Sequence, residues 1–372
     1  MQTLNYNALS HDSWVPYPLR SRFILLLAVT LLAGCESFNY YHQAASGHLS
    51  ILAKKKPISE YITAQDTSPA LKGQLNKVLA LRRFADQQLA LPVKGQYSSY
   101  AELNRRYVVW NVFAAPALST QARQWCYPVI GCASYRGYYS RTNAQTYAEK
   151  LSSQGLDVYL AGVTAYSTLG WFNDPVLNTF IQRSDAELAN LIFHELAHQV
   201  LYAKGDTVFN ESFATVVAKE GVKRWLQHQN NLAAYHRFIQ YQERHDQFIA
   251  LVISHRDKLQ TLYDTDANDG QKKQGKTGIL LALKDQHRKL KQSWGGRSDY
   301  DRWFNHDLNN AQLNTVAAYN ELVPAFEALL AQYNGDLTTF YTHAKRLALI
   351  GHEKRKQNWL PITQAYLLKQ AD

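Results

Sequence analysis

The chain has 372 residues, of which 46% are hydrophobic, and its 40 Lys and Arg outnumber its 30 Asp and Glu to give a formal net charge of +10. A chain of this length can bury a sizeable core and form two or three subdomains. The positive charge is spread over several short basic runs without a nucleic-acid-binding motif, so we expect no nucleic-acid partner. A solvated surface accounts for this charge best; attraction to an anionic membrane surface or to acidic peptides is the alternative.

The N-terminal residues have the features of an export signal. Arg20 and Arg22 precede a run over residues 23–32 that is apolar except for Thr30 and is too short to span a membrane as a mature helix. The run ends in Leu31-Leu32-Ala33-Gly34-Cys35, which resembles the lipobox of bacterial lipoproteins. We therefore expect a lipoprotein signal peptide over residues 1–34, with an uncleaved anchor or an ordinary secretory signal as the alternative.

The lipobox resemblance also implies where the protein is held. Cys35 would carry the lipid and become the first mature residue, so the membrane is an expected partner. Glu36, rather than Asp, follows it, and the resemblance therefore includes no inner-membrane retention signal. We expect a periplasm-facing protein that is lipid-anchored to the outer membrane.

The pattern from residue 39 to about residue 91 is helical, with Ser68-Pro69 at the start of one clear helix and Leu91-Pro92 at its end. Between residues 106 and 163 the pattern changes to short β-rich runs, interrupted by one helix over about residues 143–154. The expected strands lie at residues 107–113, 125–130, 134–139 and 157–163.

Two cysteines lie within this β-rich region. Five residues separate Cys126 from Cys132, and in an oxidising periplasm this spacing is typical of a local disulfide. A cysteine zinc site is a poor alternative because two thiols are too few and the compartment would oxidise them.

The strongest chemical signal is the HExxH motif at His194-Glu195-Leu196-Ala197-His198. On a helix, two histidines four residues apart project from one face, so both imidazoles can reach a single zinc ion. Glu195 is turned from His194 by about a quarter of a circle. There its carboxylate can take a proton from metal-bound water without becoming a ligand. The motif therefore predicts metal-assisted hydrolysis with Glu195 as the general base.

The residues around the motif predict that it lies in the middle of a helix. Ser184-Asp185-Ala186-Glu187 is a capping box, an apolar stripe follows, and Lys204-Gly205 closes the segment. A second helical pattern opens at residues 209–214 and runs to about residue 227. Because the link is short, we expect two antiparallel neighbouring helices.

Zinc held by two histidines needs a third protein ligand and keeps one position for water. Glu211, at the start of the second helix, is our prediction, and Glu220 is the rival. Zinc is the preferred metal on ligand type, although manganese or cobalt could also occupy a site of two histidines and one carboxylate.

The remaining chain is mainly helical. Residues 231–263 and 279–294 form two amphipathic stretches separated by a polar loop, and residues 300–368 are again helical. Residues 264–270 in the loop have the acidic character of a calcium loop, but their glycine is one place late, which favours an ordinary turn. The oxyanion of a peptide hydrolase needs a hydrogen-bond donor, for which Tyr319 and Tyr166 are both candidates.

Several segments together resemble a bacterial family of predicted zinc aminopeptidases, which are exported or lipid-anchored proteins of the HExxH, gluzincin-like class. The similarity covers nearly the whole mature chain. It is carried by Tyr107 to Pro116, Tyr135 to Tyr138, Tyr166 to Phe172, Leu191 to Gln199, Gly205 to Thr207, Asn210 to Ala214 and Asn309 to Ala311.

The stretch Asn210-Glu211-Ser212-Phe213-Ala214 is also similar to that of aminopeptidase N-type enzymes, whose glutamate is the third zinc ligand. This chain departs from them in one respect: only twelve residues separate His198 from Glu211, fewer than in those enzymes, so the helix connection must be tighter.

The order of the elements is that of thermolysin-like zinc peptidases. We expect a predominantly helical α+β fold whose zincin core has a small mixed sheet, then the HExxH helix and the ligand helix. The expected regions are an N-terminal helical region (35–105), the catalytic core (106–228), a helical hairpin or cap (229–298) and a C-terminal helical region (299–372). In such enzymes an edge strand binds extended substrate through its backbone. Residues 158–165 are the candidate here, with an inner strand as the alternative.

We therefore predict a zinc-dependent peptidase, with aminopeptidase specificity preferred. That subtype needs an acidic group for the free α-amine of the peptide, and the sequence does not assign it, although Asp174 and Glu220 are conceivable. One alternative is an endopeptidase acting on envelope proteins. Another is a lipoprotein that keeps structural zinc as a binding module or chaperone, against which Glu195 argues because a structural site has no use for a base.

Overall fold

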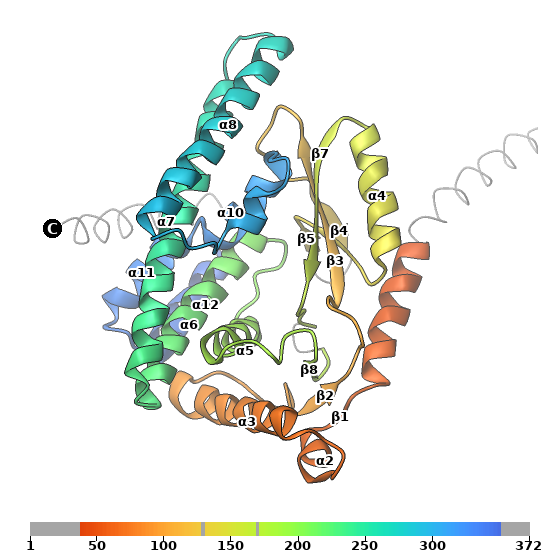
Figure 1. Ribbon diagram of the computed structural model, residues 1–372, viewed down its shortest axis with the longest axis vertical. Coiled ribbons are helices and arrows are strands. Elements are labelled where there is room, and N and C mark those ends of the chain that lie inside the picture. The colour runs from red at the N-terminus through yellow and green to blue at the C-terminus, as the bar shows by residue number, and fades with distance from the viewer. Residues whose placement is uncertain (1–37, 128–130, 169–170, 351–372) are drawn as a thin grey trace, which may run out of the picture. The chain divides into compact units, whose positions relative to one another are not determined.

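The computed structural model describes residues 38–127, 131–168 and 171–350 (Figure 1). Its contacts divide the chain into one unit of residues 1–46 and another of residues 47–372. In the first unit, residues 38–46 are helical; Cys35 and the predicted signal peptide lie outside the described residues. Among the helices that are described, none has the length and apolar character needed to cross a membrane.

Helices account for 61% of the described residues and the strands form small sheets, so the expectation of a predominantly helical α+β protein is confirmed. The second unit begins with helical residues 47–52, followed by β1 (Lys56–Pro57), α2 (Ile58–Thr63) and α3 (Pro69–Leu89). The start of α3 agrees with the prediction, because the Ser68 side chain accepts a hydrogen bond from the Leu71 N–H. The short strand β1 was not expected.

The strands form three sheets. In the largest, β3 (Val109–Pro116) lies between β6 (Arg136–Tyr138) and β7 (Leu156–Val163) and runs antiparallel to both. In the second, β2 (Ser99–Ala101) pairs antiparallel with β1 and parallel with β8 (Val176–Leu177). The third is a hairpin of β4 (Trp125–Tyr127) and β5 (Gly131–Ala133). Helix α4 (Arg141–Ser153) packs against β3 and β7.

β7 lies at the edge of its sheet, since among the described strands it pairs with β3 alone. The pairing runs from Val163 opposite Val109 to Leu156 opposite Pro116. Residues 158–163 of the expected substrate-binding segment are thus on an edge strand rather than an inner one. The Asn309 side chain donates a hydrogen bond to the Val158 carbonyl at 3.0 Å, so this part of the strand already has a partner.

Two neighbouring helices, α5 (Asp185–Val200) and α6 (Thr207–His228), carry the HExxH motif and the predicted third ligand. α5 begins with the predicted capping box of Ser184 and Glu187. It ends at Val200, before the predicted Lys204-Gly205, because the backbone is already extended at Leu201. A Cβ at Gly221 would lie 2.7 Å from the Phe193 ring, so glycine permits the close approach of α6 to α5.

The rest of the chain is helical: α7 (Leu232–Tyr263), α8 (Asp269–Ser293), α9 (Asp301–Phe304), α10 (Asn310–Asn320), α11 (Val323–Gln332) and α12 (Leu337–Leu349). α7 and α8 lie side by side as a long hairpin (Figure 1). The predicted loop before residue 279 is wrong in length, because Asn268 and Gln271 form a capping box that starts α8 at Asp269. This capping box overlaps the end of residues 264–270, the segment with calcium-loop character.

Among the described residues, apolar side chains form a main core, a smaller second core and a cluster of Phe113, Ala115 and Ala311. The main core includes side chains from Ile51 to Ala344 and joins α3, α5, α6, α11 and α12. The smaller core joins α7 and α8 to α9 and α10. Helices from the predicted N-terminal, catalytic and C-terminal regions therefore share one core, and the proposed boundaries at 105, 228 and 298 stay predictions.

Candidate metal centre

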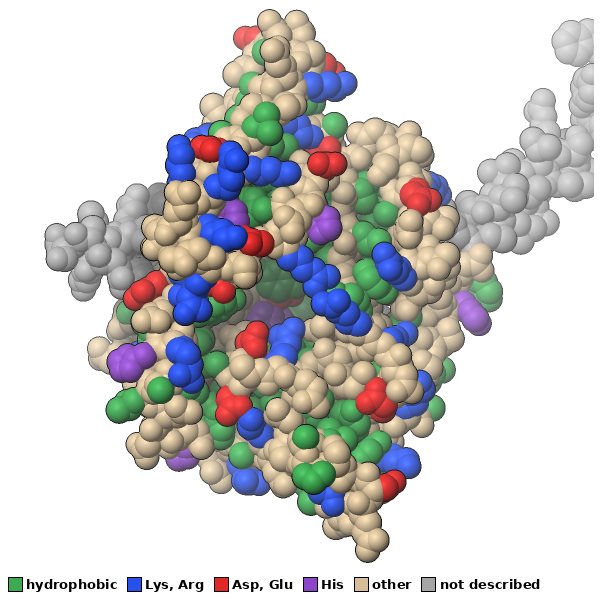
Figure 2. Space-filling view, viewed as in Figure 1, with side chains coloured by type: hydrophobic (Ala, Val, Ile, Leu, Met, Phe, Trp, Pro, Cys, Tyr) green, Lys and Arg blue, Asp and Glu red, His purple; other side chains and the backbone are tan. Residues whose placement is uncertain are grey.

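Three predicted ligands come together where α5 and α6 pack. The Glu211 carboxylate oxygen Oε2 lies 3.1 Å from His194 Nε2 and 3.7 Å from His198 Nε2. One potential ligand atom from each residue lies within 4.8 Å of the others, so the group could hold a metal ion. On the face seen in Figure 2, histidine atoms lie at depth in a hollow near the centre.

The connection between the two helices is fixed by Asn210, a residue to which sequence reasoning gave no role of its own. Its side chain is 1% exposed. Its Oδ1 accepts a hydrogen bond from the Ala203 N–H at 2.7 Å, and its Nδ2 donates to the Ala203 carbonyl at 2.8 Å. Asp206 caps α6 by accepting from the Phe209 N–H. These bonds determine where α6 starts and so place Glu211 beside the histidines.

The carboxylate of Glu211 is held in its charged form. Burial acts to raise its pKa, but hydrogen bonds from His194 and His198 outweigh burial and lower the pKa to about 2. For His198, burial acts to lower the pKa, while the hydrogen bond and the charge of Glu211 raise it. The group therefore offers a cation two imidazole nitrogens and one anionic oxygen.

Glu195 lies next to the three ligands but is not one of them. Burial is the largest influence on its carboxyl and raises the pKa, with a further increase from Glu211 and opposing effects of His194 and His198. A carboxylate that is made more basic in this way is suited to accepting a proton from water.

Tyr319, on α10, faces the metal-ligand group. Its ring is stacked on that of His194, with centroids 6.2 Å apart. The charge of Glu211, and then burial, raise its pKa well above the ordinary value, so the hydroxyl keeps its proton. α6 positions this end of α10, because the Ser212 and Thr215 hydroxyls each donate to the Tyr319 carbonyl at 3.4 Å.

Tyr166, the other predicted oxyanion donor, has different neighbours. Its hydroxyl lies 2.8 Å from His48 Nδ1, within hydrogen-bonding distance. Burial and the neighbouring Tyr139 raise its pKa. The structure thus brings Tyr319 to the metal ligands and pairs Tyr166 with His48; the role of each in catalysis stays a prediction.

The rival ligand Glu220 lies outside the three-residue group. Its carboxylate accepts a hydrogen bond from Arg224 Nε at 2.7 Å and lies 3.7 Å from Lys223 Nζ. Glu220 therefore has its own cationic partners along α6.

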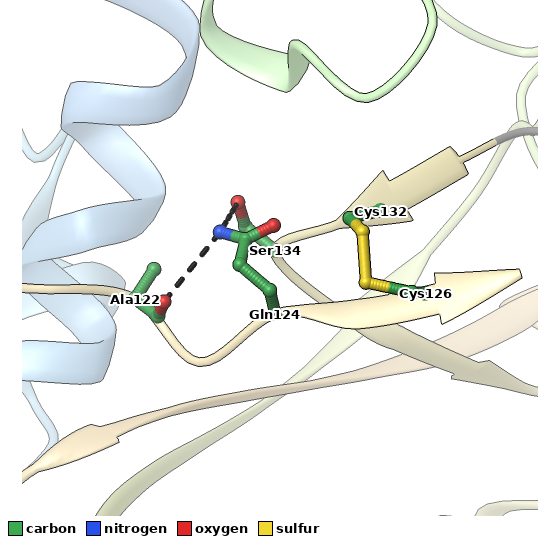
Figure 3. The surroundings of a disulfide bond; sticks show 5 residues. All are labelled: Ala122, Gln124, Cys126, Cys132 and Ser134. Atoms are coloured by element: carbon green, nitrogen blue, oxygen red, sulfur yellow. Dashed lines mark hydrogen bonds between the residues drawn. A yellow bond between two sulfur atoms is a disulfide. The ribbon is translucent and has the colours of Figure 1, made fainter.

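Cys126 and Cys132 are joined by a disulfide across β4 and β5, where they face each other in register (Figure 3). The neighbouring Gln124 Nε2 donates to the Ser134 hydroxyl at 2.9 Å, which adds a second link between the two segments (Figure 3).

The residues present suit zinc, which prefers tetrahedral sites with nitrogen and oxygen ligands and, in hydrolases, three protein ligands. His194, His198 and Glu211 supply such a set within one small volume. One usual feature is missing among the described residues: the buried Nδ1 of His198 has no hydrogen-bond partner, whereas a ligating histidine generally donates its second ring N–H.

Together, the fold and the site define an α+β protein with a candidate metal centre of two histidines and one glutamate. Comparison with known families then places the chain: it belongs to the family described as "Putative aminopeptidase", which matches residues 39–359. No curated protein matches the chain, and no solved structure does.

Proposed function

We propose that the protein is a zinc-dependent peptidase with aminopeptidase specificity. The observation that carries this proposal is the convergence of His194, His198 and Glu211 with Glu195 beside them. The family description supports the aminopeptidase subtype. The arrangement is also what a thermolysin-like zincin core would provide, with β7 as the edge strand along which an extended peptide would lie.

The three ligands would hold zinc, which when bound polarises a peptide carbonyl and lowers the pKa of a water molecule. Glu195 would take a proton from the attacking water on its carboxylate and return it to the amine that leaves, so that the carboxylate is regenerated. Tyr319 would donate its hydroxyl hydrogen bond to the oxyanion that forms on the carbonyl oxygen. Tyr166 is the second candidate for that donor.

We also propose that a lipid on Cys35 attaches the protein to the outer membrane and that its peptide substrates are in the periplasm. The lipobox resemblance and the apolar run before Cys35 support this proposal. Labelling with a radioactive fatty acid would test it, and Cys35→Ser should abolish incorporation.

The activity is tested with residues 36–372, the mature chain without Cys35, by measuring bound metal and the hydrolysis of aminoacyl amides and N-acetylated peptides, with and without chelator. Glu195→Gln should retain zinc and lose hydrolysis, whereas His194→Ala should lose zinc as well. Normal cleavage by Glu195→Gln would refute the general-base role. A parent protein that binds no metal would refute the zinc proposal, and cleavage of N-acetylated peptides alone would indicate an endopeptidase.

A further inference from the structure

A second group of titratable side chains lies apart from the metal ligands. It consists of Asp174, Tyr97 and Tyr166, which come from two loops that precede α5, and the charge of Glu195 acts on two of them, Asp174 and Tyr97. Burial, and then the charges of Glu195, Asp174 and Tyr166, raise the pKa of Tyr97. Sequence reasoning did not single out Tyr97.

Three hydrogen bonds join the two loops. The Tyr97 N–H donates to the Asp174 carbonyl at 2.8 Å, and the Asp174 N–H donates to Gln96 Oε1 at 2.8 Å. Gln96 Nε2 donates to the Phe172 carbonyl, also at 2.8 Å. Tyr97 itself has a φ of +55°, a left-handed conformation that is uncommon for an aromatic residue. Such strain is typical of functional sites, where the surroundings hold a residue in place.

The carboxylate of Asp174 is buried, and the residue is 2% exposed. One oxygen accepts a hydrogen bond from the Thr168 N–H at 2.8 Å, and the other accepts from the Thr168 hydroxyl at 2.9 Å. Each oxygen therefore keeps further capacity to accept. Lys55 is the cation that acts on Asp174, but it is the weakest influence on this carboxyl, and its Nζ lies 3.4 Å from the Asn173 carbonyl.

Tyr97 adds a hydroxyl to this group. The residue is 3% exposed, and burial and neighbouring charges, rather than a hydrogen bond, shift the pKa of its hydroxyl. The hydroxyl is not one of the fully buried atoms that lack a partner, so a ligand could still reach it. The charges of two carboxylates, Glu195 and Asp174, act on this hydroxyl, and the charge of Glu195 acts on Asp174. This combination of negative charge, a hydroxyl and an aromatic ring suits an ammonium group.

We propose that Asp174 and Tyr97 bind the α-ammonium group of the N-terminal residue of a peptide. Asp174 supplies the countercharge, and Tyr97 supplies a hydroxyl acceptor and an aromatic ring. The proposal rests on the proposed peptidase function and deepens it, because it names the residues that would select peptides with a free N-terminus. In a peptide bound in this way, the carbonyl carbon of the N-terminal residue lies only two bonds from the bound amine, so cleavage would release a single amino acid.

The experiment compares two ligands that lack a scissile peptide bond, L-leucinol and N-acetyl-L-leucinol, on the zinc-loaded mature chain by titration calorimetry. The parent should bind the amine more tightly. Asp174→Asn should lose roughly ten- to a hundredfold of this affinity, because a hydrogen bond to a charged group is removed, and should bind the acetylated ligand as before. Tyr97→Phe, which keeps the ring, should lose less.

Zinc content and circular dichroism are measured for each variant, so that misfolding is distinguished from loss of the amine site. Asp66→Asn is the matched control, since Asp66 is exposed and the change of charge is the same. Equal binding of the two ligands by the parent, or an unchanged preference in Asp174→Asn, would overturn the proposal. Selective binding of leucinol without hydrolysis of leucine amide would instead refute the peptidase function and leave the amine site standing.

Discussion

Asn210→Ala is expected to destabilise the protein and weaken its hold on metal. The Asn210 side chain makes two buried hydrogen bonds to the backbone of Ala203, at 2.7 and 2.8 Å. Alanine would leave the buried Ala203 N–H unpaired, at a cost of about 1–3 kcal/mol. The Ala203 carbonyl would keep the hydrogen bond from the Asp206 N–H at 3.2 Å, so loss of its second donor adds only about 1 kcal/mol. The free energy of unfolding should therefore fall by roughly 2–4 kcal/mol, a large part of the 5–15 kcal/mol typical of a native protein.

Urea denaturation monitored by circular dichroism measures this change, through a lower midpoint at an unchanged slope. Competition with a chromogenic chelator measures zinc affinity, which should fall roughly tenfold or more, because outer contacts that orient a ligand are worth that much in other zinc sites. Asn143→Ala is the control, since Asn143 is exposed on α4 and should change stability by less than about 0.5 kcal/mol. Parent-like stability and zinc affinity in Asn210→Ala would refute the role of Asn210 in placing Glu211.

Three further changes have defined outcomes. Tyr319→Phe should lower kcat roughly a hundredfold while zinc content stays constant, because an oxyanion donor is lost. An effect on KM alone, or a larger effect of Tyr166→Phe, would contradict the proposal that Tyr319 is the oxyanion donor. Burial, and to a smaller degree the charge of Glu195, raise the pKa of Asp174 to about 6. Because only the carboxylate attracts an ammonium group, KM for free-amine substrates should rise as the pH falls below about 6, and a profile that is the same in Asp174→Asn would disprove this origin. Replacing Cys126 and Cys132 by Ser should lower the free energy of unfolding by roughly 2 kcal/mol, since the closed loop is short; urea denaturation would measure it, and reductant should affect the parent alone.

Local features could be predicted well from the sequence because they depend on neighbouring residues. The capping box at Ser184 and the apolar stripe after it determine a helix, and on any helix His194 and His198 share a face. The register of β4 and β5 likewise depends on a short turn, which places Cys126 opposite Cys132. The ends of elements were less predictable, as at α8, where the capping residue Asn268 is surrounded by other residues that favour turns.

Long-range relations could not be predicted, because they depend on packing between distant segments. Tyr319 and Tyr166 were equal candidates for the oxyanion donor in the sequence, and the packing of α10 on α6 is what brings Tyr319 next to His194. Tyr97 and Asp174 are 77 positions apart in the chain, and their contact depends on hydrogen bonds between two loops.

The sequence by itself therefore determined the chemistry that is available: two histidines and a base on one helix, a glutamate soon after it, and a pair of cysteines in a local hairpin. Periodicity, capping and short spacing suffice for this, because they act within a few turns of the chain. The tertiary structure alone decided which other side chains surround those groups. It stacked Tyr319 on His194, joined Asn210 to Ala203 by hydrogen bonds, and put Asp174 and Tyr97 where the charge of Glu195 acts on them. These positions follow from how helices and loops pack once the shared core is buried.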